Sequence, residues 1–331
     1  MIPHNKPTIG ETEARVANDI ICSGWVAQGQ QVDLFENEFC EYLGLDYGHA
    51  LAVSSCTAAT YLALLLSGAI GKPIGMPAYT CTAVRNAVGH IGSEILVDSG
   101  LDNPNIDINK LNKEELHYAV VPHMYGIMAD VKKVRQDICL IEDCAQSLGA
   151  EGHRKGNIRN IGVFSFYATK IMTSGGMGGM LVARDKNLIQ EARDYRDFDQ
   201  KVDDKRRFNF QMTDIQAGIG RVQLRLLPEF VSRRWEIYHK YKSAGINLLP
   251  IQEYDVPFRA IMLTGDIETK INRLASSNIK AINPMEEIEI MQNDELSPVA
   301  HGWATKTLSL PIYPSLTDDD VDYIIREVKK L

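Results

Sequence analysis

The 331-residue sequence lacks the features that mark membrane-spanning and disulfide-rich secreted proteins. Its longest apolar run, residues 61–66, is far shorter than the roughly 20 residues that a membrane-spanning helix needs. The N-terminal stretch carries acids and a proline where a signal peptide has an apolar centre. The six cysteines show no CxxC pair and no disulfide-framework spacing, so we predict no metal site and a reducing compartment. Together these absences predict a cytoplasmic protein with no membrane partner.

Clustered basic charge is missing as well. The formal net charge is −8, and the clearest block of like charge is the acidic DDD at residues 318–320. Because neutralising phosphates requires clustered Lys and Arg, a nucleic-acid partner is not expected. What the sequence does have is apolar material: 45% of its residues are hydrophobic, which is sufficient for a large core.

Helix and strand patterns alternate along the chain. Short apolar runs predict buried strands at residues 49–55, 73–76, 93–97, 117–121, 138–141, 162–166 and 180–183. Amphipathic spacing predicts helices at residues 11–22, 31–43, from about 57, 213–244 with a bend near Pro228, and 318–330. This alternation predicts an α/β protein with a large domain, residues 1–244, and a smaller C-terminal α+β domain, residues 245–331. The N-terminal segment is a further candidate part of the small domain.

Three motifs follow predicted strands, where sites form in α/β proteins. SSCTAAT (residues 54–60) could bind a phosphate through backbone N–H groups and the hydroxyl of Thr57, although taken alone a simple helix N-cap is favoured. Asp143 ends the strand LIED and is either a surface acid or the partner of a buried cation. Lys170 precedes the glycine-rich TSGGMGG, and most lysines are merely solvated. None of the three decides the function alone.

The combination of the three motifs is more specific. A partly buried lysine can act as an amine nucleophile on a carbonyl group. A phosphate cradle, an acid that keeps a pyridine nitrogen protonated and a lysine that forms a Schiff base together describe a site for pyridoxal 5′-phosphate (PLP).

The sequence resembles the DegT/StrS family of PLP-dependent sugar aminotransferases. The resemblance is carried by VSSCTAATYLAL, PHMYGIMADV, IEDCAQSLGA, SFYATK with GGMGG, FNFQMTDIQAGIGRVQL and TLSLPIYPSL, which occur in the family's order and belong to matching segments that cover about two-thirds of the chain. It implies the PLP-dependent transferase fold of type I, with a mostly parallel seven-stranded sheet. It also implies that an amino group moves from an amino acid, with glutamate expected, to a keto-sugar carried by a nucleotide. The product would serve surface-polysaccharide or secondary-metabolite sugar biosynthesis.

The resemblance also implies residue roles. Lys170 would form the Schiff base and move protons, Asp143 would pair with the pyridinium nitrogen, and Gln146 would lie near the 3-oxygen of the ring. Three residues would hold the phosphate: Cys56, through its backbone, Thr57 and Ser165. Asn209 would reach the phosphate of a neighbouring subunit, which predicts a homodimer with shared active sites.

The sequence departs from the family pattern at the predicted cofactor site. Cys56 replaces a usual glycine, and Cys81 stands where an aromatic residue often stacks on the cofactor ring, so either Cys81 or Tyr79 is expected to cover the ring. Because of Cys81 and the altered glycine loop, a non-catalytic PLP-binding or regulatory protein of the same fold is the alternative function. Two neighbours of the motifs are left outside the site: His123, which could face the cofactor or be a satisfied loop histidine, and Glu142, which should point to the other side of its strand and matter little.

Overall fold

The computed structural model describes residues 1–331, with the side chains of residues 154–156 excepted. The strands are β1 (Ala50–Val53), β2 (Pro73–Pro77), β3 (Ser93–Val97), β4 (Tyr118–Pro122), β5 (Cys139–Asp143), β6 (Ile161–Ser165), β7 (Gly179–Ala183), β8 (Ala260–Leu263) and β9 (Thr307–Leu310). The α-helices are α1 (Glu11–Ser23), α2 (Gln30–Leu43), α3 (Cys56–Leu66), α4 (Thr82–Gly89), α5 (Ile108–Leu111), α6 (Lys186–Arg196), α7 (Asp214–Ser243), α8 (Ile267–Ser276), α9 (Pro298–Ala304) and α10 (Asp318–Val328).

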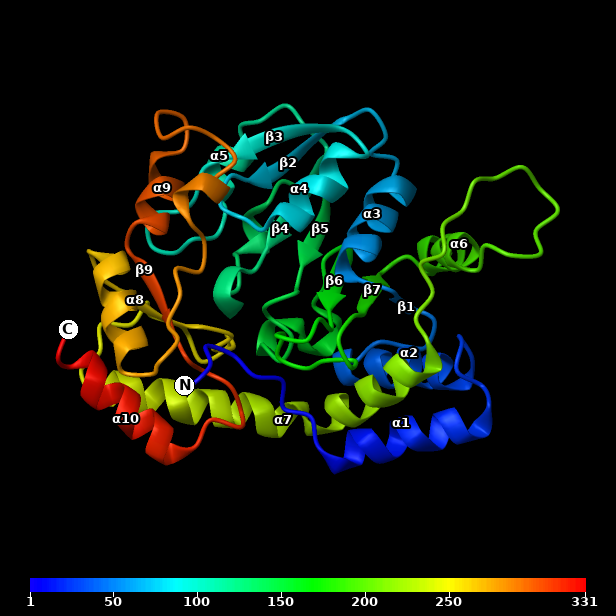
Figure 1. Cartoon of the computed structure of the whole chain (residues 1–331). Coiled ribbons are helices and arrows are strands. Elements are labelled where there is room, and N and C mark those ends of the chain that lie inside the picture. Colours follow the sequence, from blue (N-terminus) through cyan, green and yellow to red (C-terminus); the bar gives the residue numbers. More distant parts are fainter.

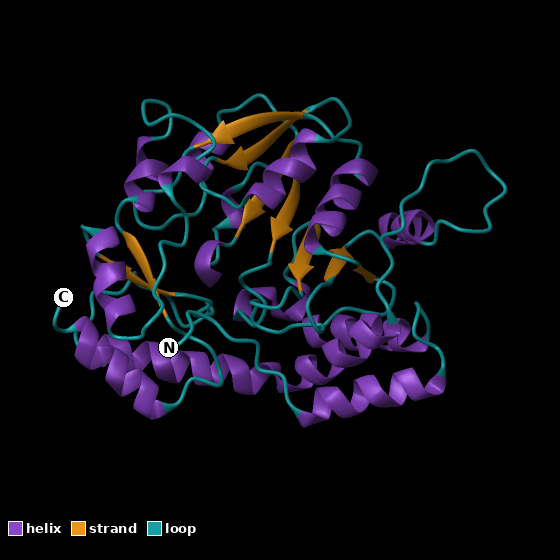
Figure 2. Ribbon diagram, viewed as in Figure 1, coloured by secondary structure: helices purple, strands orange, loops and turns teal.

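The first seven strands form one sheet in the order β1-β7-β6-β5-β4-β2-β3. The pairs from β6 through β5, β4 and β2 to β3 are parallel, and β7 runs antiparallel to both β6 and β1. All seven predicted strands are present, so the prediction of a mostly parallel seven-stranded sheet is confirmed. Figure 2 shows this sheet with helices on both sides.

Alternate residues of the strands pack into two hydrophobic cores, one on each face of the sheet. Ala52, Phe164 and Val182 pack with α2 and the first half of α7, whereas Leu51 and Val163 pack with α3, α4 and α6. Because both faces are covered, the central strands read as continuous apolar runs, and this is why their positions could be predicted from sequence.

A two-stranded antiparallel sheet, β8 with β9, lies in the C-terminal part of the chain. Its core also takes Ile237, Tyr238 and Tyr241 from the second half of α7. The predicted long helix is therefore confirmed, and it continues through Pro228 along the lower side of both parts in Figure 1. Since α7 contributes to both cores, the boundary at residue 244 stays a prediction.

The N-terminal segment crosses from one part of the molecule to the other. Ile2 forms a bridge with Ile279 beside the small sheet, whereas the side-chain amide of Asn5 donates to the carbonyl of Thr169 at 2.7 Å. The segment thus contacts both parts and passes next to the predicted site lysine, so its assignment to the small domain stays a prediction. Within the described part of the chain, no helix is both long and apolar enough to cross a membrane.

Candidate active site

A pocket of about 280 Å³ opens where β5 and β6 end and α3 and α4 begin. Parallel strands bring their carboxyl ends to one edge of a sheet, and β5 pairs directly with β6, so the residues that follow both strands meet there. The pocket is lined by Ser55, Cys56, Thr57, Thr60, Cys81, Ala83, Val84, Asp143, Ala145, Ser165, Tyr167, Lys170, Met177 and Gly178. Six of the eight predicted site residues are therefore together.

Lys170 lies in a turn after β6, where its backbone N–H donates to the carbonyl of Tyr167 at 2.9 Å. The glycine-rich loop that follows passes close to the pocket, and Gly178 has φ +155°, a conformation that side chains rarely adopt. A Cβ there would also collide with Ser174 and Met212. The loop thus depends on glycine to bring its backbone to the pocket wall beside Lys170.

Asp143 ends β5 and points into the same pocket. Its Oδ1 accepts from the backbone N–H of Ala145 at 2.9 Å, and the Cys56 thiol lies 4.0 Å away. Burial raises the pKa of this carboxyl, although the Ala145 N–H and the nearby charge of Lys170 act to lower it. As predicted, no salt bridge within the described residues joins Asp143 to Lys170. The carboxylate is left facing the pocket without a cation of its own.

The helix α3 begins at the opposite wall. Ser55 is its N-cap, with the side-chain oxygen accepting from the N–H of Ala58 at 3.1 Å, so the simple capping interpretation is correct for this residue. The exposed Thr57 hydroxyl and the first N–H groups of the helix remain directed at the pocket side. Gly179 of β7 packs so closely that a Cβ would overlap the backbone of Ser55 and Cys56. The strand fixes where the helix starts.

Burial also affects the thiol of Cys56. It raises the pKa well above its usual range, and the neighbouring Asp143 carboxylate adds to the rise. The thiol therefore stays protonated and can donate weakly to that carboxylate. Ser165, the last residue of β6, is buried at the pocket wall, and its Oγ accepts from the N–H of Tyr167 at 3.3 Å.

The structure distinguishes between the two candidates for covering the cofactor ring. Cys81 is exposed in the pocket at the N-cap of α4, where its sulfur accepts from the N–H of Ala83 at 3.4 Å. Tyr79 is fully buried, and its hydroxyl is bonded to that of Tyr125 instead. Of the two candidates only Cys81 lines the pocket, and its contact with a cofactor ring stays a prediction.

Two predicted residues do not line this pocket. The amide oxygen of Gln146 accepts from the N–H of Tyr125 at 2.8 Å. Asn209 is exposed near the end of the segment between α6 and α7, where the carbonyl of Phe210 accepts from the N–H of Ser54 at 2.8 Å. The middle of this segment extends away from the body of the molecule in Figure 1. The expected contacts of Gln146 with the 3-oxygen of the ring and of Asn209 with the partner's phosphate stay predictions.

The predicted orientation of Glu142 is confirmed. The side chain points away from the pocket, as expected from strand alternation, but it is buried. Glu142 accepts from the N–H of Arg159 at 2.7 Å and lies 3.3 Å from Nε2 of His123. His123 is completely buried and also accepts from the N–H of Ala129 at 3.0 Å. The expectation that Glu142 matters little for activity stays a prediction, whereas its loss would leave buried donors without partners and so lower stability.

His123 also belongs to a buried group with Cys144 and His153 whose ligand atoms lie within 4.8 Å of one another. These atoms already have protein partners: Nε2 of His153 is 2.7 Å from the Ser147 hydroxyl, and its Nδ1 is 3.9 Å from the Cys144 sulfur. Burial lowers the pKa of His153 well below its usual value, so the ring stays neutral. The group is a satisfied polar network rather than an open metal site.

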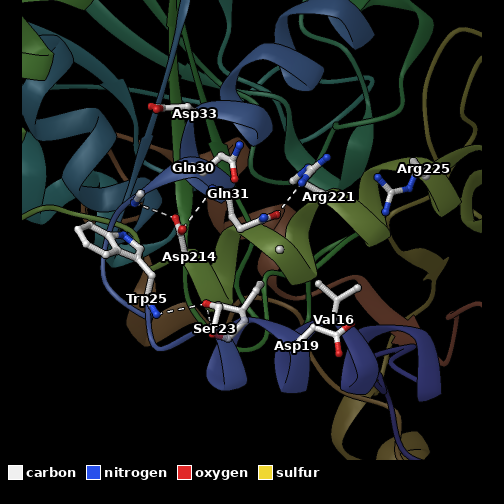
Figure 3. Close-up of a pocket in the computed structure, with 13 residues that line it drawn as sticks. Val16, Asp19, Ser23, Trp25, Gln30, Gln31, Asp33, Asp214, Arg221 and Arg225 are labelled. Carbon is white, nitrogen blue, oxygen red and sulfur yellow. Dashed lines mark hydrogen bonds between the residues drawn. The ribbon is translucent and has the colours of Figure 1, made fainter.

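A larger cavity, of about 850 Å³, lies between α1, α2 and α7 (Figure 3). Two of its polar groups form structural bonds: Asp214 accepts from the N–H groups of Gly29 and Val32, and Arg221 pairs with Glu38. Trp25 lies at its rim, 64% exposed, and donates to the carbonyl of Gln28. The cavity therefore offers no group comparable to Lys170 with Asp143.

The residues of the smaller pocket fit PLP. The unpaired Asp143 suits a protonated ring nitrogen, the start of α3 suits a phosphate, and Lys170 suits the aldehyde. Phe258 also belongs to this neighbourhood, since Nζ of Lys170 lies 5.4 Å from its ring centroid. No motif predicts that contact, because residue 258 reaches the lysine only through tertiary folding.

Comparisons with known proteins identify the family and the fold. The sequence profile described as the DegT/DnrJ/EryC1/StrS aminotransferase family matches residues 7–329. Similar curated proteins include GDP-perosamine synthase of Vibrio cholerae, 28% identical over 99% of this chain and 98% of that protein. Another is dTDP-4-dehydro-2,3,6-trideoxy-D-glucose 4-aminotransferase of Saccharopolyspora spinosa, 28% identical over 100% of this chain and 96% of that protein.

Among solved structures, the aminotransferase TlmJ from Streptoalloteichus hindustanus superposes with a TM-score of 0.91 at 27% identity, covering 100% of this chain and 98% of that one. The fold prediction is thereby confirmed. The match over nearly the whole chain means that this protein belongs to the DegT/DnrJ/EryC1/StrS aminotransferase family, whose members use PLP.

Proposed function

We propose that this chain transfers an amino group from an amino acid, with glutamate as the expected donor, to a ketone carbon of a nucleotide-linked sugar. The observation that carries the proposal is the meeting of Lys170 and Asp143 in one pocket from neighbouring strand ends. The two curated relatives are named for a GDP-linked and a dTDP-linked sugar, which supports a nucleotide-linked acceptor.

Each pocket residue has a separate expected role in the reaction. Bound PLP supplies an electron-accepting ring through which an amino group can pass between two carbon skeletons. Lys170 provides the amine that holds the aldehyde and moves protons at the reacting carbon. Asp143 keeps the ring nitrogen protonated, because a nearby carboxylate favours the charged form. Thr57, Ser165 and the first N–H groups of α3 hold the phosphate.

Incubation with an amino donor tests the proposal directly. The purified protein loaded with PLP is mixed with L-glutamate, and its absorption spectrum and the release of 2-oxoglutarate are followed. We expect conversion to the pyridoxamine form with one 2-oxoglutarate released per site. A panel of nucleotide-linked keto-sugars then identifies the acceptor that regenerates the PLP form. A protein that binds PLP yet is converted by no amino acid would instead be a non-catalytic member of the family.

We further propose that two copies of the chain share their active sites. Tyr167 and Met177 line the pocket yet are 48% and 49% exposed, which supports a cover that a second copy would provide. Asn209, which is exposed, is the residue expected to reach the partner's phosphate. Sedimentation measurements with and without PLP test this: a monomer that binds PLP at full occupancy would contradict shared sites.

A cytoplasmic location is likewise proposed. All six cysteines are free thiols, including the exposed Cys22 and Cys81. Thiols persist in reducing compartments, which supports the cytoplasm as the place where the protein works.

A further inference from the structure

Three cationic side chains surround the ring of Phe258. Nζ of Lys170 and Cζ of Arg259 each lie 5.4 Å from the ring centroid, and Cζ of Arg234 lies 6.0 Å from it. The cations come from the large sheet, from the segment before β8 and from α7, so the fold brings them together from distant parts of the sequence. Each gains some stabilisation from the aromatic ring.

Lys170 has the Asp143 carboxylate nearby, but the two arginines of this cluster have no carboxylate partner among the described residues. Arg234 is buried and donates to the backbone carbonyls of Phe258 and Ile312, which gives it a structural role. Arg259 is half-buried, and its Nη1 lies 3.4 Å from Nε2 of His4. Within the described part of the chain, no carboxylate forms an ion pair with either arginine. A concentrated, uncompensated charge of this kind is costly and favours binding of an anion.

The histidine beside Arg259 lies in the same positive environment. Burial, followed by the charges of Arg259, Lys280 and Arg234, lowers the pKa of His4 to about 3. His4 is therefore neutral at physiological pH, and it lies 2.9 Å from the Ser309 hydroxyl. It orients the guanidinium of Arg259 without neutralising it.

We propose that Arg259 binds a carboxylate of the amino donor, an inference that rests on the proposed aminotransfer. The phosphate of the cofactor has its own cradle at the start of α3, on a different element. An amino acid that exchanges its amino group at Lys170 carries a carboxylate within a few bonds of that nitrogen. The guanidinium of Arg259 shares the Phe258 ring with Lys170 and can bind a carboxylate through two parallel hydrogen bonds.

Binding of the unreactive dicarboxylate glutarate tests the assignment apart from turnover. Glutarate is titrated calorimetrically into the PLP-loaded wild type, Arg259→Gln and the matched control Arg233→Gln, which alters an arginine on α7 that pairs with Asp318. Arg259→Gln should weaken glutarate binding by about ten- to a hundredfold, the usual range for losing a charge-assisted hydrogen bond. Arg233→Gln should bind as the wild type does. The glutamate concentration that half-saturates conversion to the pyridoxamine form should rise in parallel.

Two results would overturn the assignment of Arg259 as the carboxylate-binding residue. Unchanged glutarate and glutamate binding in Arg259→Gln would overturn the inference. So would weaker binding of GDP or dTDP with unchanged glutarate binding, because the anion would then be the nucleotide's diphosphate. If Arg259→Gln does not fold, Arg259→Lys replaces it and should bind glutarate about three- to tenfold more weakly, since the paired contact is lost. Failure of the proposed function looks different: the wild type itself would not be converted by glutamate.

Discussion

Replacing Asp143 with asparagine should have opposite effects on the protein with and without PLP. The asparagine keeps the shape of the side chain and an oxygen that can accept from the Ala145 N–H, but it removes the charge. With PLP bound, the change breaks an enclosed ion pair, which costs about 3 kcal/mol, the lower end of the usual range because Asp143 keeps some exposure. At 1.4 kcal/mol per factor of ten, the rate of conversion by glutamate should fall by roughly a hundredfold.

Without PLP, the effect of Asp143→Asn on stability should have the opposite sign. The pKa of Asp143 is raised by burial above its ordinary value of 3.8, so the folded protein holds the proton more tightly than the unfolded chain does. A carboxyl of this kind costs stability once the pH exceeds its unfolded pKa. At pH 7 the cofactor-free Asp143→Asn protein should therefore be at least as stable as the wild type. Its advantage should disappear as the pH falls below 3.8, where the carboxyl is protonated in both states.

Thermal unfolding of both proteins, each with and without PLP, measures this reversal. With PLP the apparent Tm of Asp143→Asn should lie roughly 5 °C below that of the wild type, and without PLP it should be equal or higher. An equal drop in both forms would show that Asp143 acts as a structural residue instead. An unchanged conversion rate would refute the pairing with the ring nitrogen altogether.

Three further substitutions have distinct expected results. Lys170→Ala should abolish turnover, measured as 2-oxoglutarate release, yet retain PLP non-covalently through the phosphate cradle; normal turnover would contradict the role of the lysine. Glu142→Gln should lower the free energy of unfolding by about 1–3 kcal/mol in urea titrations, because the charge beside His123 is lost from a buried network. The conversion rate per folded Glu142→Gln molecule should stay near that of the wild type, and a hundredfold loss would place Glu142 in the active site. Gly179→Ala should push the backbone of Ser55 away and weaken PLP binding, measured by equilibrium dialysis; unchanged binding would show that the cradle tolerates the shift.

The sequence was sufficient to predict the sheet and most of the pocket for a definite physical reason. Strands buried on both faces are continuous apolar runs, and residues that follow parallel strands converge on one edge, so Asp143 and Lys170 could be placed together, whereas Ser165 was predicted from the family resemblance. Residues of this kind depend mainly on local pattern and on sheet order.

What could not be predicted depends on long-range packing. Whether Tyr79 or Cys81 faces the pocket is decided by a contact with Tyr125, and the burial of Glu142 is decided by His123. Phe258 and Arg259 lie in a segment without a motif, about 90 residues from Lys170 in the sequence. Their approach to the lysine follows from how the small sheet docks, which periodicity and spacing do not encode.

The shared helix α7 limits how this enzyme can be recombined with its relatives. Exchanging the C-terminal part to transplant substrate preference would require a junction, and the predicted boundary falls immediately after this 30-residue helix. A junction there would join Ile237 and Tyr241 of one parent to a small sheet from the other. A junction within the helix would instead separate these residues from Leu224 and Leu227, which pack under the large sheet. Chimaeras should therefore carry α7 and the small sheet from one parent, with the facing residues of α1 and α2 matched to them.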